Sequence, residues 1–289
     1  MTTPNILTDT TPVRDEQRSE LVHSIITDAW GLYFAQGGVV MAAATRAMEL
    51  VLERDDLTLA SASATFCRPV ACGPVTTVVD VLRSGRRGAQ VHATLRDATA
   101  PEGEASVVIT AVFTDPTMAG PSLSLVPRPD DLLVPPPADL EPEPFESEFP
   151  LGFLDNTQWQ HATDPAALEA ALADPAAGPR PNMAVWFRFT DPPAAEGQDW
   201  DPALLPIPGD ALGTALSVAL AGGDEPIGSV SLQIGLQVFA PMRGTWIGVD
   251  SWCSHVGNGL ANGPCQLWSD QGVHVATVTQ TAMLRSFGG

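Results

Sequence analysis

Two glycine-containing helix starts carry the most chemical potential in this sequence. Gly37 and Gly38 open an Ala-rich stretch that predicts a helix, and Gly209 and Asp210 open a shorter one. Main-chain N–H groups at a helix start can bind an anion or a developing oxyanion, and glycine permits close approach. A carboxylate at such a place can cap the helix or take a proton from an attacking water. Both roles are open for Asp210 at this stage.

The two helix starts hold equivalent places in a repeat. Each is followed by a strand-like run that ends at a proline, Pro69 in the first half and Pro241 in the second. Gly38 precedes Pro69 by 31 positions, and Asp210 precedes Pro241 by 31 positions. A repeat of this length predicts two copies of a small domain, with a ligand site at the seam between them. Only the second copy has a carboxylate there, so we expect one active site per chain.

The composition argues against several other chemistries. All 14 basic residues are arginine, so no lysine can form a Schiff base. The four cysteines include no CxxC pair and the five histidines are scattered, so we expect no metal site and no cofactor. The absence of a GxSxG motif argues against a serine nucleophile of the α/β-hydrolase kind.

Charge and apolar runs predict a cytoplasmic protein. The net charge of −20 opposes binding to nucleic acid and to anionic membrane surfaces. The polar N-terminus has no signal-peptide core, and the densest apolar run, residues 39–44, is too short to span a bilayer. We expect the cysteines to be reduced thiols.

Helical and strand-like segments alternate in an order that both halves share. Residues 31–54 predict a helix that is apolar on nearly every side and therefore buried. Alternating or β-branched runs predict the first-half strands at 58–66, 75–82, 89–96 and 105–113, with a tight turn at 84–88. The second half predicts a strand at 183–189, a helix at 210–220, and strands at 229–239, 244–252, 265–268 and 273–284.

These elements predict an α+β protein with two domains and a long connection. The expected division is a flexible tail at 1–20, a first domain at 21–115, a Pro-rich linker at 116–182 and a second domain at 183–289. Residues 116–150 hold ten prolines and little periodicity, which indicates an extended segment on the surface. A helical patch at 165–172 follows, with Asp164 as its expected N-cap.

The order of these features resembles the TesB-like acyl-CoA thioesterases, which have a tandem double hotdog fold: in each half a long helix is wrapped by an antiparallel sheet. The resemblance covers roughly residues 25–115 and 183–286 and rests on many short matches in the right order. In the first half they are Trp30, Gly37-Gly38, Arg46-Ala47, Phe66-Cys67-Arg68-Pro69-Val70, Gly73-Pro74-Val75 and residues 81–87. In the second half they are Trp186-Phe187-Arg188, Gly209-Asp210, Phe239-Ala240-Pro241, Leu267-Trp268 and residues 272–276 with Gln280.

The resemblance implies a catalytic trio of an Asp, a Ser or Thr, and a Gln that together hold a water. The matching positions are Asp210 at the second helix start, Ser231 ten positions before Pro241, and Gln280 in the last strand. Each also has a plain structural interpretation: a helix cap, an ordinary strand residue, and the solvent-facing part of an alternation. The sequence departs from the family at Gln233, where relatives often have an Asp, and at residues 259–263, which predict a loose loop.

Two further groups could bind substrate. Gly37 and Gly38 would let a thioester approach the first helix start, although they could equally serve helix packing. Arg83, Arg86 and Arg87 form the one basic cluster, and coenzyme A is an anion that such a cluster could receive. The alternative for the arginines is a solvated hairpin turn.

The expected function is hydrolysis of an acyl-CoA to free acid and coenzyme A by Asp-activated water. Two alternatives stay open: a non-catalytic hotdog protein that binds acyl groups, and an acyl-CoA hydratase or lyase on the same scaffold. Hotdog hydratases have a His a few residues from the catalytic Asp. No His lies within a few residues of Asp210, which argues against hydration. We expect a homo-oligomer, a dimer of double hotdogs, with acyl-CoA as the substrate.

Overall fold

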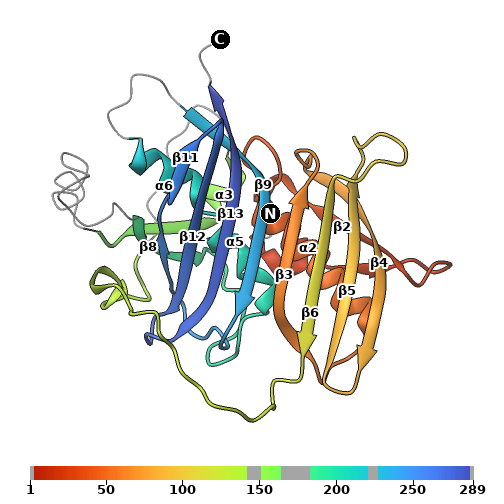
Figure 1. Ribbon diagram of the computed structural model, residues 1–289, viewed down its shortest axis with the longest axis horizontal. Coiled ribbons are helices and arrows are strands. Elements are labelled where there is room, and N and C mark those ends of the chain that lie inside the picture. Colours follow the sequence, from red (N-terminus) through yellow and green to blue (C-terminus); the bar gives the residue numbers. More distant parts are fainter. Residues whose placement is uncertain (1–2, 142–150, 164–182, 221–226, 287–289) are drawn as a thin grey trace.

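One antiparallel sheet runs through both halves of the protein (Figure 1). The computed structural model describes residues 3–141, 151–163, 183–220 and 227–286. Within these residues the sheet has 13 strands in the order β1-β2-β4-β5-β6-β3-β9-β13-β12-β10-β8-β7, with β11 paired to β12 outside that path. The first-half strands are β1 (Val13–Arg14), β2 (Leu21–Ile26), β3 (Thr58–Phe66), β4 (Gly73–Gly85), β5 (Gly88–Asp97) and β6 (Val107–Thr114). Those that follow are β7 (Thr157–His161), β8 (Met183–Phe189), β9 (Ile227–Val238), β10 (Ile247–Ser251), β11 (His255–Gly257), β12 (Leu260–Ser269) and β13 (His274–Ser286).

The two halves meet where β3 pairs with β9. In this antiparallel register Ser63 lies opposite Gly235 and Thr65 lies opposite Gln233. Outward from the seam, the first half runs β3, β6, β5, β4, β2, and the second runs β9, β13, β12, β10, β8. In each half, the last of these five strands (β2 or β8) comes before the helical segment in the chain. The other four come after it, and their places in the sheet follow the same order in both halves. The repeat expected from the sequence is therefore present in the topology.

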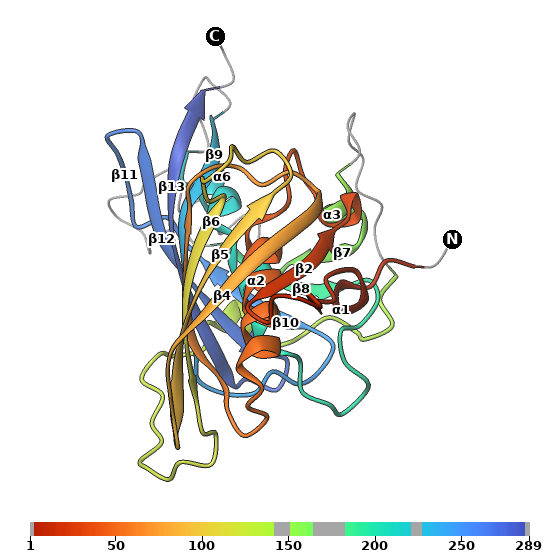
Figure 2. The same ribbon diagram turned by 90° about the vertical axis from the view of Figure 1, so that its right-hand side faces the viewer.

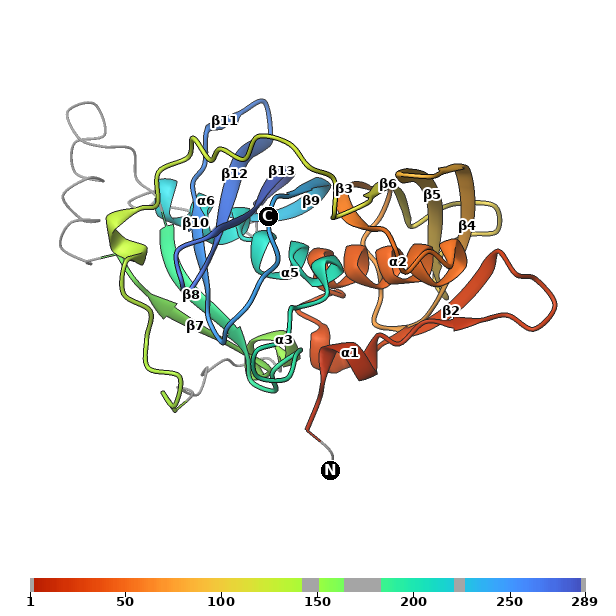
Figure 3. The same cartoon turned by 90° about the horizontal axis from the view of Figure 1, so that it is seen from below.

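Helix α2 (Gly37–Leu52) lies against one face of the first half (Figures 1, 2 and 3). The side chain of Gln36 caps it by accepting a hydrogen bond from the N–H of Val39 at 2.8 Å. The helix ends at Glu53, whose φ of 51° is left-handed. Most of its residues are buried, as the apolar pattern predicts. It begins six residues later than predicted because the preceding chain forms a tight loop closed by a bridge between Gly31 and Ala35.

The second half has two short helices where the sequence predicts one. Helix α5 (Pro206–Gly209) follows the 3-10 turn η3 (Pro202–Leu204), and α6 spans Leu212–Ala219. Asp210 lies in the break between α5 and α6, with φ −78° and ψ 58°, outside the helical region. Ala211 is the N-cap residue of α6, and its own side chain makes no capping hydrogen bond. Asp210 is therefore not an N-cap, and its carboxylate is left for other contacts.

Residues 3–20, for which the sequence predicts a flexible tail, are folded onto the first half. Asn5 caps the short helix α1 (Ile6–Asp9), and Ile6 is fully buried in the core. Strand β1 then pairs with β2. The sequence patterns predicted neither of these two strands. The residues around Ile6 are mostly polar, so composition alone predicted a loose tail. The burial of Ile6 holds this segment against the first half.

From the end of β6, the Pro-rich linker passes the lower ends of the second-half strands in Figure 1 and then reaches the side of the second half near β8 (Figures 1 and 3). Trp246 Nε1 donates to the carbonyl of Pro137 at 3.2 Å. The guanidinium of Arg188 donates to the carbonyls of Ala138 and Leu140 and lies over the Trp246 ring, 4.5 Å from its centroid. Most residues of this part of the linker are exposed, whereas Leu132 is buried against Trp186 and Trp246.

The later part of the predicted linker belongs to the sheet. After residue 150 the chain forms α3 (Gly152–Asp155) and β7, and β7 pairs with β8. The predicted helix at 165–172 lies outside the described residues. The loose loop predicted at 259–263 is instead the start of β12, which pairs with β11 across a tight turn at Asn258 and Gly259, both with positive φ.

Candidate active site

Asp210 lies where the second half meets the start of α2. Its Oδ2 accepts a hydrogen bond from the main-chain N–H of Gly38 at 3.2 Å. Its Oδ1 accepts from Nε2 of Gln280 at 2.5 Å and from Oγ of Ser231 at 3.3 Å. The three residues that the sequence singled out as a catalytic trio therefore meet in the fold, although Asp210 and Gln280 are 70 positions apart.

Gln280 is oriented by contacts on both sides of its amide. Its Nε2 donates to Ser231 Oγ at 2.7 Å as well as to Asp210, while its Oε1 accepts from the main-chain N–H of Leu212 at 3.1 Å. Because the Leu212 N–H requires an oxygen, the amide nitrogen is turned toward the carboxylate. The side chain is buried, so the interpretation of Gln280 as a solvent-facing residue is wrong. The role of Leu212 was missed, since a main-chain donor leaves no mark in the sequence.

A β-bulge in β9 brings Ser231 to the inner face of the sheet. Ile234 lies opposite Gln280 on β13, and both are buried. Between Gln233 and Ser231 the strand advances two residues while β13 advances one, so Leu232 is the extra residue. Without the bulge, alternation from Ile234 would point Ser231 to the outer face. Bulges next to active sites often re-aim a side chain in this way.

Burial raises the pKa of Asp210 to about 6. Hydrogen bonds from Gly38, Gln280, Ser231 and Gly37 act in the opposite direction, because they stabilise the charged carboxylate. The start of α2 also favours negative charge beside it. The balance gives an Asp that is ionised near neutral pH and basic enough to accept a proton from water.

Both glycines of the first helix start are needed for contact between the halves. A Cβ on Gly38 would meet the carbonyl oxygen of Pro206 at 2.3 Å, and one on Gly37 would meet Asp210 Oδ2 at 2.7 Å. Gln36 adds a hydrogen bond from its Nε2 to the carbonyl of Ile207 at 3.1 Å. The Gly38 N–H is used by Asp210, so this helix start receives the carboxylate of the second half. Substrate contact by Gly37 and Gly38 stays a prediction.

The equivalent place in the first half is apolar. Strand β3 has a bulge between Leu59 and Ser61, and its extra residue Ala60 precedes Pro69 by nine positions, as Leu232 precedes Pro241. Leu59 then matches Ser231. On β6, which pairs with β3, Ala111 matches Gln280. At the start of α2, Gly38 matches Asp210. None of these three first-half residues can take or hold a proton with its side chain.

The structure does not bring the arginine cluster to Asp210. Arg83, Arg86 and Arg87 lie at the hairpin that joins β4 to β5, as the turn prediction indicated. Arg54, just after the end of α2, donates to the carbonyls of Gly85 and Arg86, so this hairpin lies beside the C-terminal end of that helix. Asp210 is at the other end, and 16 residues of helix separate the two by about 24 Å.

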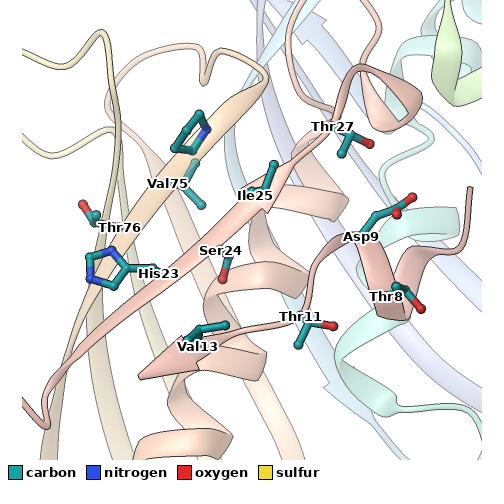
Figure 4. Close-up of a pocket in the computed structure, with 11 residues that line it drawn as sticks. Thr8, Asp9, Thr11, Val13, His23, Ser24, Ile25, Thr27, Val75 and Thr76 are labelled. Atoms are coloured by element: carbon teal, nitrogen blue, oxygen red, sulfur yellow. The ribbon is translucent and has the colours of Figure 1, made fainter. Parts of the chain in front are cut away.

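A hollow of about 530 Å³ lies at the outer edge of the first half, away from the trio (Figure 4). It is lined by α1, β1, β2 and the start of β4, including Thr8, Val13, Ser24 and Val75. Among the described residues no cluster of three or more His, Cys, Asp or Glu side chains could hold a metal ion. No helix within the described ranges is long and apolar enough to cross a membrane.

The chain matches known families and folds along most of its length. The N-terminal domain of the acyl-CoA thioesterases matches residues 26–114, and the C-terminal domain matches residues 137–284. No curated protein matches the chain.

Solved structures with the same fold have low sequence identity. A hot dog protein of unknown function from Alicyclobacillus acidocaldarius has a TM-score of 0.75 at 19% identity, over 98% of this chain and 99% of that one. A putative thioesterase II from Thermobifida fusca has a TM-score of 0.74 at 23% identity, over 99% of both chains. The acyl-CoA thioesterase II TesB2 from Mycobacterium marinum has a TM-score of 0.68 at 19% identity, over 98% of this chain and 99% of that one.

The fold is thus a hotdog fold with a large antiparallel sheet and few helices. The chain belongs to the acyl-CoA thioesterase family, whose two domains it matches in order, and is a thioester hydrolase.

Proposed function

We propose that this protein hydrolyses an acyl-CoA to the free acid and coenzyme A, with Asp210 as the general base. The hydrogen-bonded trio of Asp210, Ser231 and Gln280 is the observation that carries the proposal. It couples a carboxylate of raised pKa to a hydroxyl and an amide, which can hold and orient a water.

In the proposed reaction a water near Asp210 attacks the thioester carbonyl carbon. Asp210 takes one proton from that water as the new C–O bond forms. Collapse of the tetrahedral intermediate breaks the C–S bond, and the coenzyme A thiolate recovers the proton from Asp210. The products are the acid and coenzyme A, and no other reactant is consumed. Removal of the proton contributes about 10²–10⁴-fold to the rate.

We infer that the two halves are tandem hotdog domains and that each chain has one active site. The mirrored strand order and the two bulges at matching positions support the tandem arrangement. The apolar residues Leu59 and Ala111 at the first-half place support a single site.

The outer sheet face supports the proposed homo-oligomer. Arg285, near the C-terminal end of β13, is the one charged outward side chain on the described part of the four central strands. The other outward side chains there are neutral, although the chain has a net charge of −20. They include Val108, Thr110, Val112 and Thr114 on β6, Ser61, Ser63 and Thr65 on β3, Gln233 and Gln237 on β9, and Thr277, Thr279 and Thr281 on β13. Two copies of an acidic chain repel each other, and this repulsion is weakest where a neutral face of one copy meets the same face of the other. Sedimentation should show a dimer that Thr110→Glu dissociates.

The proposed cytoplasmic location is consistent with the cysteines. Cys67, Cys72, Cys253 and Cys265 are all free thiols in the structure. Disulfides are rare in reducing compartments, so this state fits the location that the sequence predicts.

Release of free thiol from a series of acyl-CoA substrates, followed with a thiol reagent, tests the function. We expect thiol release that depends on Asp210. A protein that binds acyl-CoA without releasing thiol would support the acyl-binding alternative. A change in enoyl-CoA absorbance without thiol release would support a hydratase.

A further inference from the structure

The ten residues that end at Asp210 form a stiff apolar segment with an acid at each end. The sequence from Asp201 to Asp210 is Asp-Pro-Ala-Leu-Leu-Pro-Ile-Pro-Gly-Asp. Of the eight residues between the two acids, the seven from Ala203 to Gly209 are buried. Three of them are prolines, whose rings restrict φ. We call residues 201–210 the strut.

Both ends of the strut are attached to the same helix, α2. At the Asp210 end, the carboxylate accepts from the N–H of Gly38. At the other end, Oδ2 of Asp201 lies 3.3 Å from Nε of Arg46 in an ion pair whose side chains are only 15% and 22% exposed. Gly38 and Arg46 are eight residues apart, about 12 Å along the helix. Asp201 also accepts from the N–H of Ala203 at 2.9 Å, which caps η3.

Arg46 links a third element to this junction. Its Nη1 donates to the carbonyl of Leu7 at 3.0 Å and to Oγ1 of Thr10 at 2.8 Å. The guanidinium therefore joins the N-terminal segment, α2 and the strut at one point. Several directed hydrogen bonds to one guanidinium define its orientation better than a single charge pair does.

We propose that Arg46 and Asp201 are positioning residues for Asp210: their ion pair holds the strut against α2 so that the Asp210 carboxylate meets the Gly38 N–H. This inference rests on the proposed role of Asp210 as the base. A shift of the strut along α2 would stretch two hydrogen bonds at the start of that helix, from Gly38 to the Asp210 carboxylate and from Gln36 to the carbonyl of Ile207. Loss of the bond from Gly38 would raise the pKa of Asp210, since that bond stabilises the charged form.

A second buried acid shares the same cation. Glu49 lies one turn after Arg46 on α2, and burial, followed by repulsion from Asp201, raises its pKa to about 8, against the attraction of Arg46. Burial also raises the pKa of Asp201, and the Ala203 N–H and Arg46 oppose that shift. Asp201 and Arg46 are the charged groups that act on Glu49. Because Glu49 is protonated at neutral pH, the Arg46 guanidinium pairs with the Asp201 carboxylate.

Asp201→Asn tests the proposal with little direct damage to the fold. Asn is as good an N-cap as Asp, so η3 keeps its cap, but the ion pair to Arg46 is lost. We expect kcat to fall about 10-fold from misplacement of the base, with KM unchanged and the acid limb of the rate moved to higher pH. Arg46→Lys keeps a cation beside Asp201, so its loss of kcat should be less than half of the loss in Asp201→Asn.

Arg14→Met is the matched control. Arg14 pairs with Glu53 at 2.7 Å and donates to the carbonyl of Leu50, so its contacts lie at the C-terminal end of the same helix, away from the strut. It should leave kcat and the acid limb as in the wild type. Equal effects of Asp201→Asn and Arg14→Met on the acid limb would overturn the proposal, because a general loss of stability would then explain both.

Direct titration of Asp210 separates this proposal from the proposed activity. Carbon-13 NMR of labelled aspartate, with the Asp210 signal assigned through Asp210→Asn, reports its pKa without any turnover. A higher Asp210 pKa in folded Asp201→Asn supports the positioning role even if the wild type releases no thiol. An unchanged pKa in that variant refutes it even if the wild type is an active thioesterase.

Discussion

The main-chain N–H of Gly38 donates to Oδ2 of Asp210 at 3.2 Å, and the two residues hold equivalent places in the two halves of the chain. One half thus supplies a main-chain N–H at a helix start, and the other supplies the carboxylate that accepts from it. Glycine is required on one side because any side chain there would strike α5. In the proposed mechanism, this pairing leaves two similar halves with one catalytic acid, Asp210.

Asp210→Asn should lower kcat about 10²-fold or more, because an amide cannot accept the proton of the attacking water. The variant should fold, since Asn is nearly the same size and its amide oxygen can accept a bond from a neighbouring donor. Thiol release and circular dichroism on the same preparation would check both points. Wild-type turnover in a folded variant would exclude Asp210 as the base.

Ser231→Ala and Gln280→Ala should each lower kcat, and the double variant should lose less than the product of the two single losses. Gln280 Nε2 donates to both Ser231 and Asp210, so the residues act as one unit. A double-mutant cycle on kcat measures the coupling. If the losses multiply, the two residues act independently and the shared-water mechanism is wrong.

The pH dependence of kcat/KM should have an acid limb near the pKa of Asp210, about 6. Below it the base is protonated and the rate should fall about tenfold per pH unit. The sign for stability is opposite to that of an ordinary salt-bridged acid. Because the folded pKa lies above the ordinary pKa of an aspartate, Asp210 favours folding below that ordinary pKa, and this contribution is lost as pH rises through about 6.

The stability consequence can be measured by urea unfolding between pH 4 and 7. The difference in free energy of unfolding between Asp210→Asn and the wild type should shift in favour of the variant as pH rises through this window. A difference that does not change with pH would mean that the folded pKa of Asp210 is close to its unfolded value.

Gly38→Ala should destabilise the protein by about 1–3 kcal/mol, the usual cost of overpacking, and should reduce activity. The new methyl group would lie 2.3 Å from the carbonyl oxygen of Pro206, so α5 must move and carry Asp210 with it. Gly213→Ala in α6 is the control, because its nearest neighbour would be Ser229 Oγ at 3.4 Å. Thermal unfolding and kcat of both variants decide whether close packing at Gly38 matters.

Arg86→Gln combined with Arg87→Gln should raise KM for acyl-CoA if the hairpin binds the coenzyme A phosphates. It should leave kcat unchanged, because the hairpin is about one α2 length from the trio. A short thioester without the nucleotide is the control substrate, and its KM should not respond. An unchanged KM for acyl-CoA would show that the arginines only solvate a turn.

The sequence by itself determined the repeat, most strands and the members of the trio. The strands at 58–66 and 183–189 match the structure because their β-branched and apolar runs end at clear turn signals. Asp210, Ser231 and Gln280 could be chosen because the resemblance to the thioesterase family places its Asp, its Ser or Thr, and its Gln at these positions, with Ser231 ten residues before Pro241.

The tertiary structure decided what those residues face. A bulge at Leu232 turned Ser231 inward, and such a bulge depends on pairing with β13, which local sequence does not encode. The break between α5 and α6 freed Asp210 from capping, and the Gly38 N–H came from a helix 172 positions away. These contacts join segments distant in the sequence, so only the packing of the two halves could define them.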